Sequence, residues 1–275
     1  MTGHWLRRAS VVAGLTFLYV PMLVLIVFSF NESRLVTVWA GFSTKWYGEL
    51  LHDRQILSGV WLSLKVAVLA ATSATVLGTL AGLTLARFGM FRGRSVFGVM
   101  VSAPLVMPEV ITGLSLLLLF VAMGQLFGWP AQRGTLTIWI AHVTFCTAYA
   151  SVVIAARLGE LDTAVEDAAM DLGATPARVF FSITLPVIAP ALISAWLLAF
   201  TLSLDDLVIT SFVTGPGAST LPIVVFSSAR LGVSPKINAL AAVLILAVFT
   251  GTLAAWWWSG RRARRARRQA QGGID

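Results

Sequence analysis

The sequence predicts an all-α membrane protein built on six transmembrane helices, and three observations support this fold class. The first is composition: 57% of the 275 residues are hydrophobic and 12% are charged, with a mean hydropathy of +0.85, whereas soluble domains carry about 25% charged residues. The second is the number of long apolar segments, and the third is the distribution of arginine and lysine between the loops. A disulfide framework is excluded because Cys146 is the single cysteine.

The apolar segments are judged by length, because a helix needs about 20 apolar residues to cross roughly 30 Å of hydrocarbon. The first segment follows a charged, signal-like start but lacks an A-x-A cleavage pattern, so we expect it to be kept as an anchor. The second and third are long enough to tilt or kink. The expected spans are residues 11–30, 58–86, 95–123, 135–156, 187–212 and 239–259.

The basic residues favour one orientation of the chain. With the N-terminus in the cytoplasm, thirteen arginines fall in the inside loops and the tail, against six arginines and lysines outside. Because cytoplasmic loops carry the excess of positive charge, both termini are expected in the cytoplasm. The arginine-rich tail, residues 260–275, is interpreted as an anchor on anionic lipid rather than a nucleic-acid site, with Trp256–Trp258 as an interfacial belt.

Two features inside the spans predict helix packing. Gly78 and Gly82 form a small-xxx-small face that lets another helix approach closely. His142 falls within the fourth span. No metal-ligand partners cluster near it in the sequence, so we expect a packed, neutral histidine bonded within the bundle rather than a metal ligand.

The loop between the fourth and fifth spans has strong local signals. Thr163 and Glu166 fit a capping box, and Gly173 is placed to end the first helix in the left-handed conformation. Thr175 and the proline after it start a second helix, which Pro186 is expected to end. The result is a helix–glycine–helix elbow on the cytoplasmic face.

The elbow has two interpretations. A solvated amphipathic connection is the simpler one. The other is a contact site, because the adjacent Ala168 and Ala169 make a flat patch that fits a groove on another protein. The spacing favours the second: Asp167-Ala168-Ala169, three residues, Gly173, nine residues, then Ile183-x-Leu185-Pro186.

This pattern resembles the cytoplasmic E-A-A loop of the permeases of binding-protein-dependent ABC importers. Asp167 stands where the family usually has Glu; it keeps the charge and shortens the reach by one methylene, so the contact is expected to be borne partly by Glu166. Residues 36–47, 103–113 and 203–211 are similar to the polyamine branch of this family. More closely, the chain resembles permease subunits of putrescine importers over nearly its whole length.

The resemblance implies a type I ABC importer permease fold in the bacterial inner membrane. It also implies four kinds of partner: a second homologous permease, a cytoplasmic ABC ATPase dimer, a periplasmic polyamine-binding protein and the lipid bilayer. No bound cofactor or metal is expected, and the ATP is used by the partner, since the sequence has no G-x-x-x-x-G-K-[ST] phosphate loop and no H-E-x-x-H. The implied ATPase-coupling residues are Glu166, Asp167, Ala168, Ala169, Gly173, Ile183, Leu185 and Pro186.

Three parts are expected along the chain. Residues 1–57 form the first transmembrane helix and a periplasmic loop, whose aromatic residues are expected to make a short interfacial helix. Residues 58–259 form the permease domain of five helices, including the coupling loop 157–186. Residues 260–275 form the basic cytoplasmic tail.

Three carboxylates are candidates for the substrate pathway, because ionisable groups inside spans are costly. Glu109 is expected near mid-membrane in the third span, next to Pro104 and Pro108, which free backbone carbonyls beside it. An anionic group next to free carbonyls suits an alkyl diammonium. Asp205 and Asp206 lie near the outer end of the fifth span; adjacent helical residues point about 100° apart, so at most one is expected to face the pore. The alternative for all three is a structural role, with Glu109 bonded to a partner helix and the two aspartates bonded to the outer loops.

Other functions are weighed against this one. A permease of the same type for another solute, such as spermidine, an amino acid, sulfate or iron, would share the loop. A stand-alone secondary carrier would need no ATPase, and the elbow would then be a linker. A membrane enzyme lacks any clustered nucleophile, metal set or acid–base pair in this sequence.

Overall fold

The computed structural model describes residues 2–34, 38–231 and 234–271. Within these ranges every regular element is helical, and one isolated β-bridge joins Asn31 to Phe42. The chain forms two compact units, residues 58–224 and residues 1–57 with 225–275, and each is described by itself. The division at residues 58 and 260 expected from the sequence stays a prediction.

Six described helices are long and apolar enough to cross a membrane, which confirms the predicted number. They are His4–Phe28, Arg54–Arg87, Glu109–Phe127, Thr135–Gly159, Pro176–Asp205 and Pro235–Ala254. Several expected boundaries were wrong. The first span begins at His4 rather than at residue 11, and the fifth begins at Pro176 rather than at residue 187, because the helical conformation already starts before Pro186. The third span begins at Glu109 because a proline interrupts the helix just before it, and the fifth ends at Asp205 because the chain leaves the helical conformation at the next residue.

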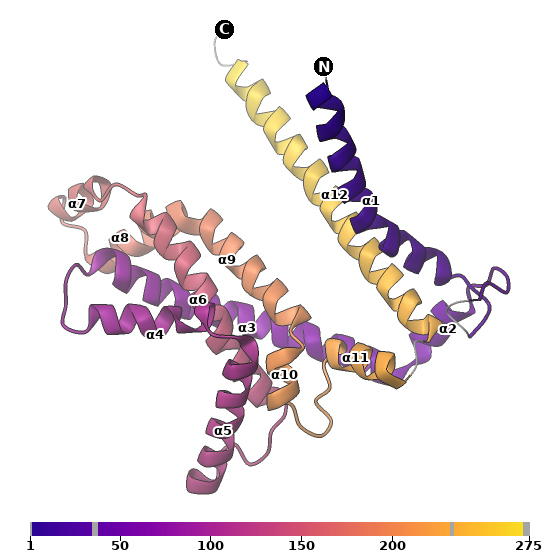
Figure 1. Cartoon of the computed structure of the whole chain (residues 1–275). Helices are drawn as coiled ribbons and strands as arrows, with labels where there is room; N and C mark the ends of the chain where they lie inside the picture. Colours follow the sequence, from indigo (N-terminus) through magenta and orange to yellow (C-terminus); the bar gives the residue numbers. More distant parts are fainter. Residues whose placement is uncertain (1, 35–37, 232–233, 272–275) are drawn as a thin grey trace. The chain divides into compact units, whose positions relative to one another are not determined.

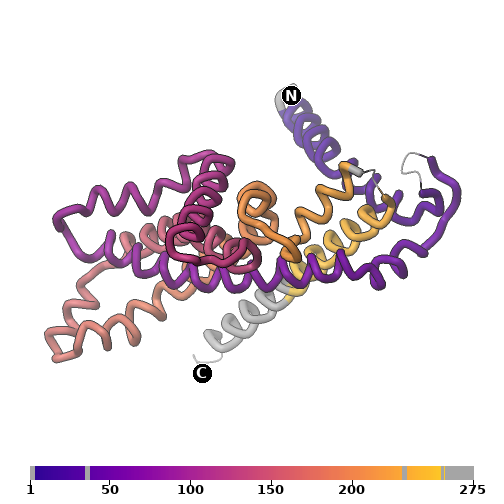
Figure 2. The backbone as a smooth tube through the Cα atoms, turned by 90° about the horizontal axis from the view of Figure 1, so that it is seen from below, coloured from indigo at the N-terminus to yellow at the C-terminus, as the bar shows by residue number. Residues whose placement is uncertain are grey.

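The unit of residues 58–224 contains most of the helices (Figure 1). α4 turns back after α3, and the chain then changes direction into α5 (Figures 1 and 2). The elements are α3 (Arg54–Arg87, whose first four residues precede the unit), α4 (Arg94–Val106), α5 (Glu109–Phe127), α6 (Thr135–Gly159), α7 (Ala164–Asp171), α8 (Pro176–Val179), the π-helical turn η1 (Phe180–Thr184), α9 (Leu185–Asp205), α10 (Val208–Val213) and the start of α11 (Leu221–Leu231), most of which belongs to the other unit.

The core of this unit lies around α6, which packs against α9. The buried face of α3 consists of small residues at helical spacing, among them Ala67, Ala71 and Ala74, continued by Gly78 and Gly82. A Cβ atom added at Gly78 would lie 2.8 Å from the Ala150 Cβ of α6. The predicted close approach of another helix to this face is therefore confirmed.

The second unit consists of α1 (Thr2–Phe28), α2 (Lys45–His52), most of α11 and α12 (Pro235–Gln271). The loop before α2 is held by Asn31, whose carbonyl accepts a hydrogen bond from Trp46 Nε1 at 2.6 Å. Lys236 at the start of α12 pairs with Glu49 and Asp53 at 3.4 and 3.5 Å. The expected short helix is α2. The side chains of Trp256, Trp258 and the tail arginines lie outside the described residues, so their anchoring role stays a prediction.

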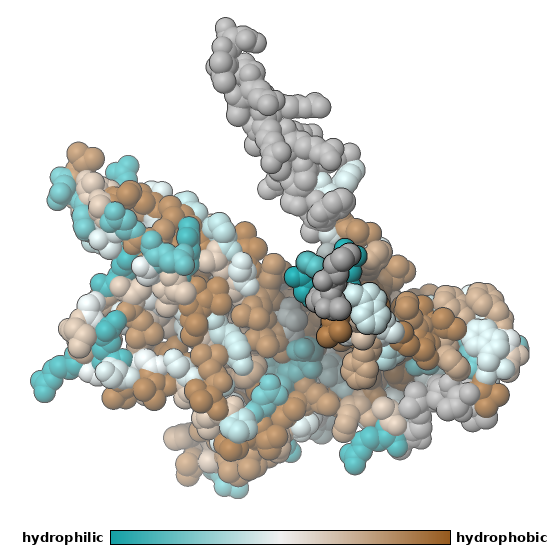
Figure 3. All heavy atoms as spheres, turned by 45° about the horizontal axis from the view of Figure 1, so that its top comes forward, coloured by the Kyte–Doolittle hydropathy of each residue, from teal (hydrophilic) through white to brown (hydrophobic). Residues whose placement is uncertain are grey.

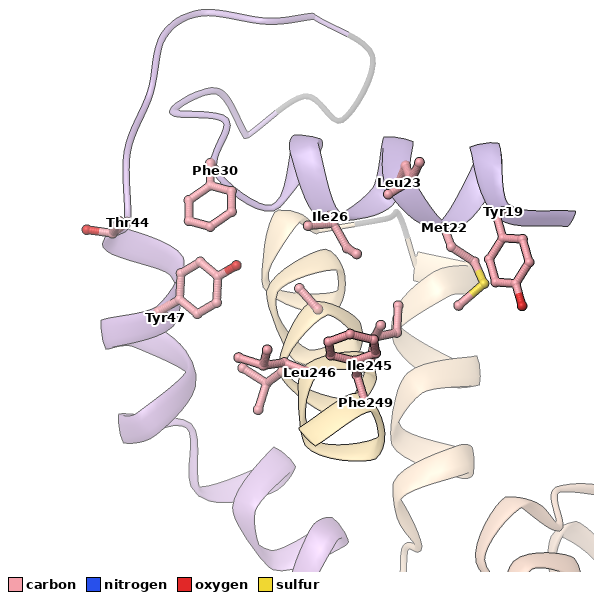
Figure 4. A pocket seen from close by; sticks show the side chains of 12 residues that line it. Tyr19, Met22, Leu23, Ile26, Phe30, Thr44, Tyr47, Ile245, Leu246 and Phe249 are labelled. Atoms are coloured by element: carbon pink, nitrogen blue, oxygen red, sulfur yellow. The ribbon is translucent and has the colours of Figure 1, made fainter. Parts of the chain in front are cut away.

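A cavity of about 860 Å³ lies between α1, α2 and α12 (Figure 4). Among its lining residues Tyr19, Thr44 and Tyr47 carry a hydroxyl, and the others are apolar: Met22, Leu23, Ile26, Phe30, Ala242, Val243, Ile245, Leu246 and Phe249. With no charged group in its lining, this cavity is unsuited to an organic cation. Apolar residues also cover much of the surface seen in Figure 3, as expected for helices that face lipid or other subunits.

Candidate functional site

The elbow begins at α7, but not with the predicted capping box. Thr163 already has helical dihedral angles (φ −69°, ψ −17°), and its side chain makes no capping hydrogen bond. Asp162 supplies the side-chain bond instead, since its Oδ1 accepts from the Ala164 N–H at 2.9 Å. Glu166 does not reach back to Thr163, because its carboxylate is bound to Arg87 and Thr184.

Gly173 ends α7 in the left-handed conformation, as predicted. Its φ is +86°, a value that glycine adopts without the penalty of a Cβ. The Gly173 N–H donates to Met170 O at 2.9 Å, and the Ala174 N–H donates to Ala169 O at 3.0 Å. This pair of bonds is the Schellman motif, which satisfies the last carbonyls of the helix.

The second half of the elbow starts as predicted and continues differently. Thr175 Oγ1 accepts from the Arg178 N–H at 3.4 Å, with proline at the first helical position. Pro186 does not end this helix: α8, η1 and α9 follow one another without a gap. The π-helical turn before it, in which the Leu185 N–H bonds to Phe180 O, provides a wider turn directly ahead of the residue that lacks an N–H.

The elbow presents a partly apolar outer surface. Asp167 and Ala168 are exposed, and Ala169 is half-buried. Two large apolar side chains of α7 and its C-cap also point away from the protein: Leu172 is 89% exposed and Val165 is 59% exposed. Ile183 and Leu185 are partly buried at the base of the elbow, and Pro186 is exposed. A surface of this kind is available for contact with another protein.

Glu109 lies at a helix break rather than inside a continuous helix. α4 ends at Val106, Met107 and Pro108 are extended (ψ 135° in each), and Glu109 is the first residue of α5. The expected place in the middle of the third span was therefore wrong, because the proline stops α4 instead of only loosening it. The Glu109 side chain is exposed, and its negative charge is favoured at a helix N-terminus.

Asp205 and Asp206, alike in the sequence, have different environments. Asp205 is the last residue of α9 and is exposed. Asp206 is 9% exposed, and its carboxylate accepts from the Thr210 N–H at 2.7 Å, the Thr210 hydroxyl at 2.6 Å and the Ile209 N–H at 3.3 Å. Asp206 therefore binds the first turn of α10, while Asp205 receives no hydrogen bond from another described residue.

A buried polar network around His142 joins α6, α9 and α10. His142 is 2% exposed; its Nδ1 lies 2.6 Å from Ser203 Oγ, and its Nε2 lies 2.8 Å from Thr210 Oγ1 and 3.2 Å from Asp206 Oδ2. The predicted packed histidine, bonded within the bundle, is confirmed. The contacts between His142 and these residues were not predicted from the sequence, although Ser203, Asp206 and Thr210 recur at the spacing of one helix face.

Residues 74–268 match the model of a family described as the binding-protein-dependent transport system inner membrane component. The match includes the whole elbow, the break before Glu109 and the His142 network. The chain belongs to this family.

Two relatives from Escherichia coli strain K12 extend the family assignment. The chain is 63% identical over 265 residues to the putrescine transport system permease protein PotI, covering 96% of this chain and 94% of that protein. It is 39% identical over 246 residues to the spermidine/putrescine transport system permease protein PotC, covering 90% of each. Both similarities cover more of the chain than the family match does.

Solved structures share the permease fold. A bacterial ABC transporter involved in the import of the acidic polysaccharide alginate matches with a TM-score of 0.72 and 14% identity, over 93% of this chain and 95% of that one. The MetNI methionine ABC transporter matches with a TM-score of 0.58 and 18% identity, over 77% and 95%. The family permease is thus a multi-pass inner-membrane protein with the type I ABC importer fold.

Proposed function

We propose that this permease carries putrescine into the cell as one subunit of an ATP-driven importer. The observation that carries the proposal is the 63% identity to a putrescine permease over 96% of the chain, against 39% to a permease named for spermidine and putrescine. The importer would contain a second, homologous permease, a periplasmic polyamine-binding protein and a cytoplasmic ABC ATPase dimer that uses the ATP.

The elbow is the proposed contact with the ATPase. Its support is geometric: α7 offers exposed Asp167 and Ala168 next to Leu172, on a helix ended by a rigid Schellman turn. Ala169 and Gly173 add no bulk there, and Ile183, Leu185 and Pro186 connect the elbow to α9. With both termini in the cytoplasm, as the arginine distribution favours, this elbow faces the ATPase.

Glu109 and Asp205 are the proposed carboxylates of the pathway. Each is exposed and lies where a helix begins or ends, so each leaves its charge available to an ammonium group. The attraction between opposite charges is much stronger in a site of low dielectric constant than in water. Asp206 is assigned instead to positioning, because its oxygens already accept bonds from α10 and face His142.

A second candidate substrate is spermidine, favoured by the name of the 39% identical relative. The test is uptake of labelled putrescine by cells with and without this chain, in competition with unlabelled spermidine. We expect uptake that depends on the chain and is displaced weakly by spermidine. Equal displacement by both amines would assign a shared polyamine importer, and uptake that does not depend on the chain would refute the proposal.

A further inference from the structure

Glu166 is the residue at which three elements of the unit 58–224 meet. It lies in α7, Arg87 is the last residue of α3, and Thr184 is the last residue of the π-helical turn that leads into α9. Glu166 thus joins the elbow to the end of α3 and to the turn that leads into α9. The neighbouring Asp167 is exposed, so the two adjacent carboxylates face different surroundings.

The contact with Arg87 is a secluded ion pair. Arg87 Nη2 donates to Glu166 Oε1 at 3.3 Å, and Arg87 Nε lies 3.2 Å from Oε2 without the direction of a hydrogen bond. The two side chains are 19% and 16% exposed. Screening by water and salt is therefore weaker than for surface pairs such as Arg157–Glu160, whose side chains are 40% and 68% exposed.

The contact with Thr184 departs from the behaviour of other helical threonines in this chain. Thr75 and Thr201, for example, donate their hydroxyls to the carbonyl four residues earlier, at 2.7 and 2.9 Å. Thr184 is buried, with 5% of the residue exposed, and its hydroxyl donates instead to Glu166 Oε1 at 2.8 Å. The bond is made by the last residue of the π-helical turn, a conformation that is rare and is often found at functional positions.

We infer that Glu166 is a positioning residue of the transport cycle, which fixes α7 to the ends of α3 and α9 so that a displacement of the elbow moves both spans together. The inference rests on the proposed function, since it assumes that the ATPase acts on the elbow. It adds a path to that function: the exposed face of α7 receives the motion, and its inward carboxylate passes the motion on through Arg87 and Thr184.

The test uses the whole importer, with both permeases, the ATPase and the binding protein, reconstituted in vesicles. Labelled putrescine taken up and ATP hydrolysed are measured in the same preparation. Glu166→Gln keeps the size and a hydrogen-bond acceptor for Thr184 but removes the charge that pairs with Arg87. We expect the amount of co-purified ATPase to stay the same, and the putrescine moved per ATP to fall about fivefold or more, the lower end of typical coupling between sites.

Two further variants separate positioning from folding. Thr184→Val preserves the side-chain volume and removes one hydroxyl, so the ratio should fall in the same direction but less. The exchange Glu166→Arg with Arg87→Glu should restore part of the ratio that either single change removes. Glu160→Gln is the matched control, because it neutralises an exposed carboxylate of an ion pair nearby, and the ratio should stay at the wild-type value.

The outcomes distinguish the inference from the function on which it rests. A wild-type ratio in Glu166→Gln overturns the inference, as does loss of assembled importer with a normal ratio in the complexes that remain. An equal fall of the putrescine-to-ATP ratio in Glu160→Gln overturns the inference as well, since the loss of any nearby negative charge would then have the same effect. Failure of the wild-type importer to move putrescine would refute the proposed function instead.

Discussion

Gly78 in α3 lies directly against Ala150 in α6, and a Cβ atom on Gly78 would stand 2.8 Å from the Ala150 Cβ and 2.9 Å from the Ser151 backbone nitrogen. Neither neighbour is the end of a flexible side chain, so neither can turn away. The two helices are therefore held at a separation that only glycine allows. This contact leads to the first of five predictions.

Gly78→Ala should destabilise the protein by about 1–3 kcal/mol, the usual cost of overpacking, although alanine favours a helix by about 1 kcal/mol over glycine. The measurement is the apparent melting temperature in detergent. Gly251→Ala in α12 is the control, because nothing lies within 4 Å of the added atom. Equal melting temperatures for the two variants would show that α3 and α6 can accommodate a methyl group at this contact.

Asp206→Asn and Asp205→Asn should affect different properties. The buried Asp206 accepts bonds from Ile209 on one oxygen and from Thr210 on the other; an amide keeps one of these acceptors, points its NH2 group at the donors of the other and costs about 1–3 kcal/mol. We expect Asp206→Asn to lower the melting temperature, and Asp205→Asn to keep it but lower putrescine uptake per assembled complex. The reverse pattern would exchange the assigned roles.

Glu109→Gln should reduce uptake steeply while the complex still assembles. The variant keeps the shape of the side chain at the start of α5 and removes the charge that the diammonium substrate needs for compensation. Uptake is measured per complex recovered with the ATPase. Loss of the complex itself, with normal uptake in what remains, would mean that Glu109 serves the fold.

Gly173→Val should impair recruitment of the ATPase, and Gly173→Asn should not. No atom lies within 4 Å of a Cβ at this position, so the cost comes from the backbone, whose φ of +86° penalises a β-branched residue by roughly 1–2 kcal/mol. Asparagine tolerates this conformation. The test is the ATPase recovered with each variant; if valine and asparagine behave alike, the left-handed turn is not needed for docking.

Reporter fusions should place Ser43 and Arg133 in the periplasm and Ala174 in the cytoplasm. The expectation follows from the thirteen-to-six distribution of basic residues. Alkaline phosphatase, which is active outside the cytoplasm, gives the measurement. Activity at Ala174, or its absence at Arg133, contradicts the orientation and removes the elbow from the side of the ATPase.

Features that depend on neighbouring residues could be predicted from the sequence. The number of spans follows from the lengths of apolar runs, and the ends of α7 and the start of α8 follow from Gly173 and Thr175, whose preferences are local. The close packing of another helix at Gly78 could also be predicted, since small residues recur there at helical spacing. In each case a few consecutive residues determine the conformation.

Features that depend on distant residues could not be predicted. The sequence predicts a capping box for Glu166, because no local pattern indicates its partner Arg87, which lies 79 residues away. Asp205 and Asp206 could not be separated, because the difference arises from His142 on another helix. The break before Glu109 was foreseen only as a loosening, since a proline kinks some helices and stops others according to what the freed groups can bind.

The π-helical turn Phe180–Thr184 adds one residue to the chain without turning α9. A π turn holds one residue more than an α turn, because its hydrogen bonds join residue i to i+5. Removing one residue there would leave a plain α-helix with α9 facing as before, whereas the same deletion in the interior of α9 would rotate everything on one side of it by about 100°. The nine residues between Gly173 and Ile183 include part of this turn, so the loop holds one residue more while Asp205 keeps its facing.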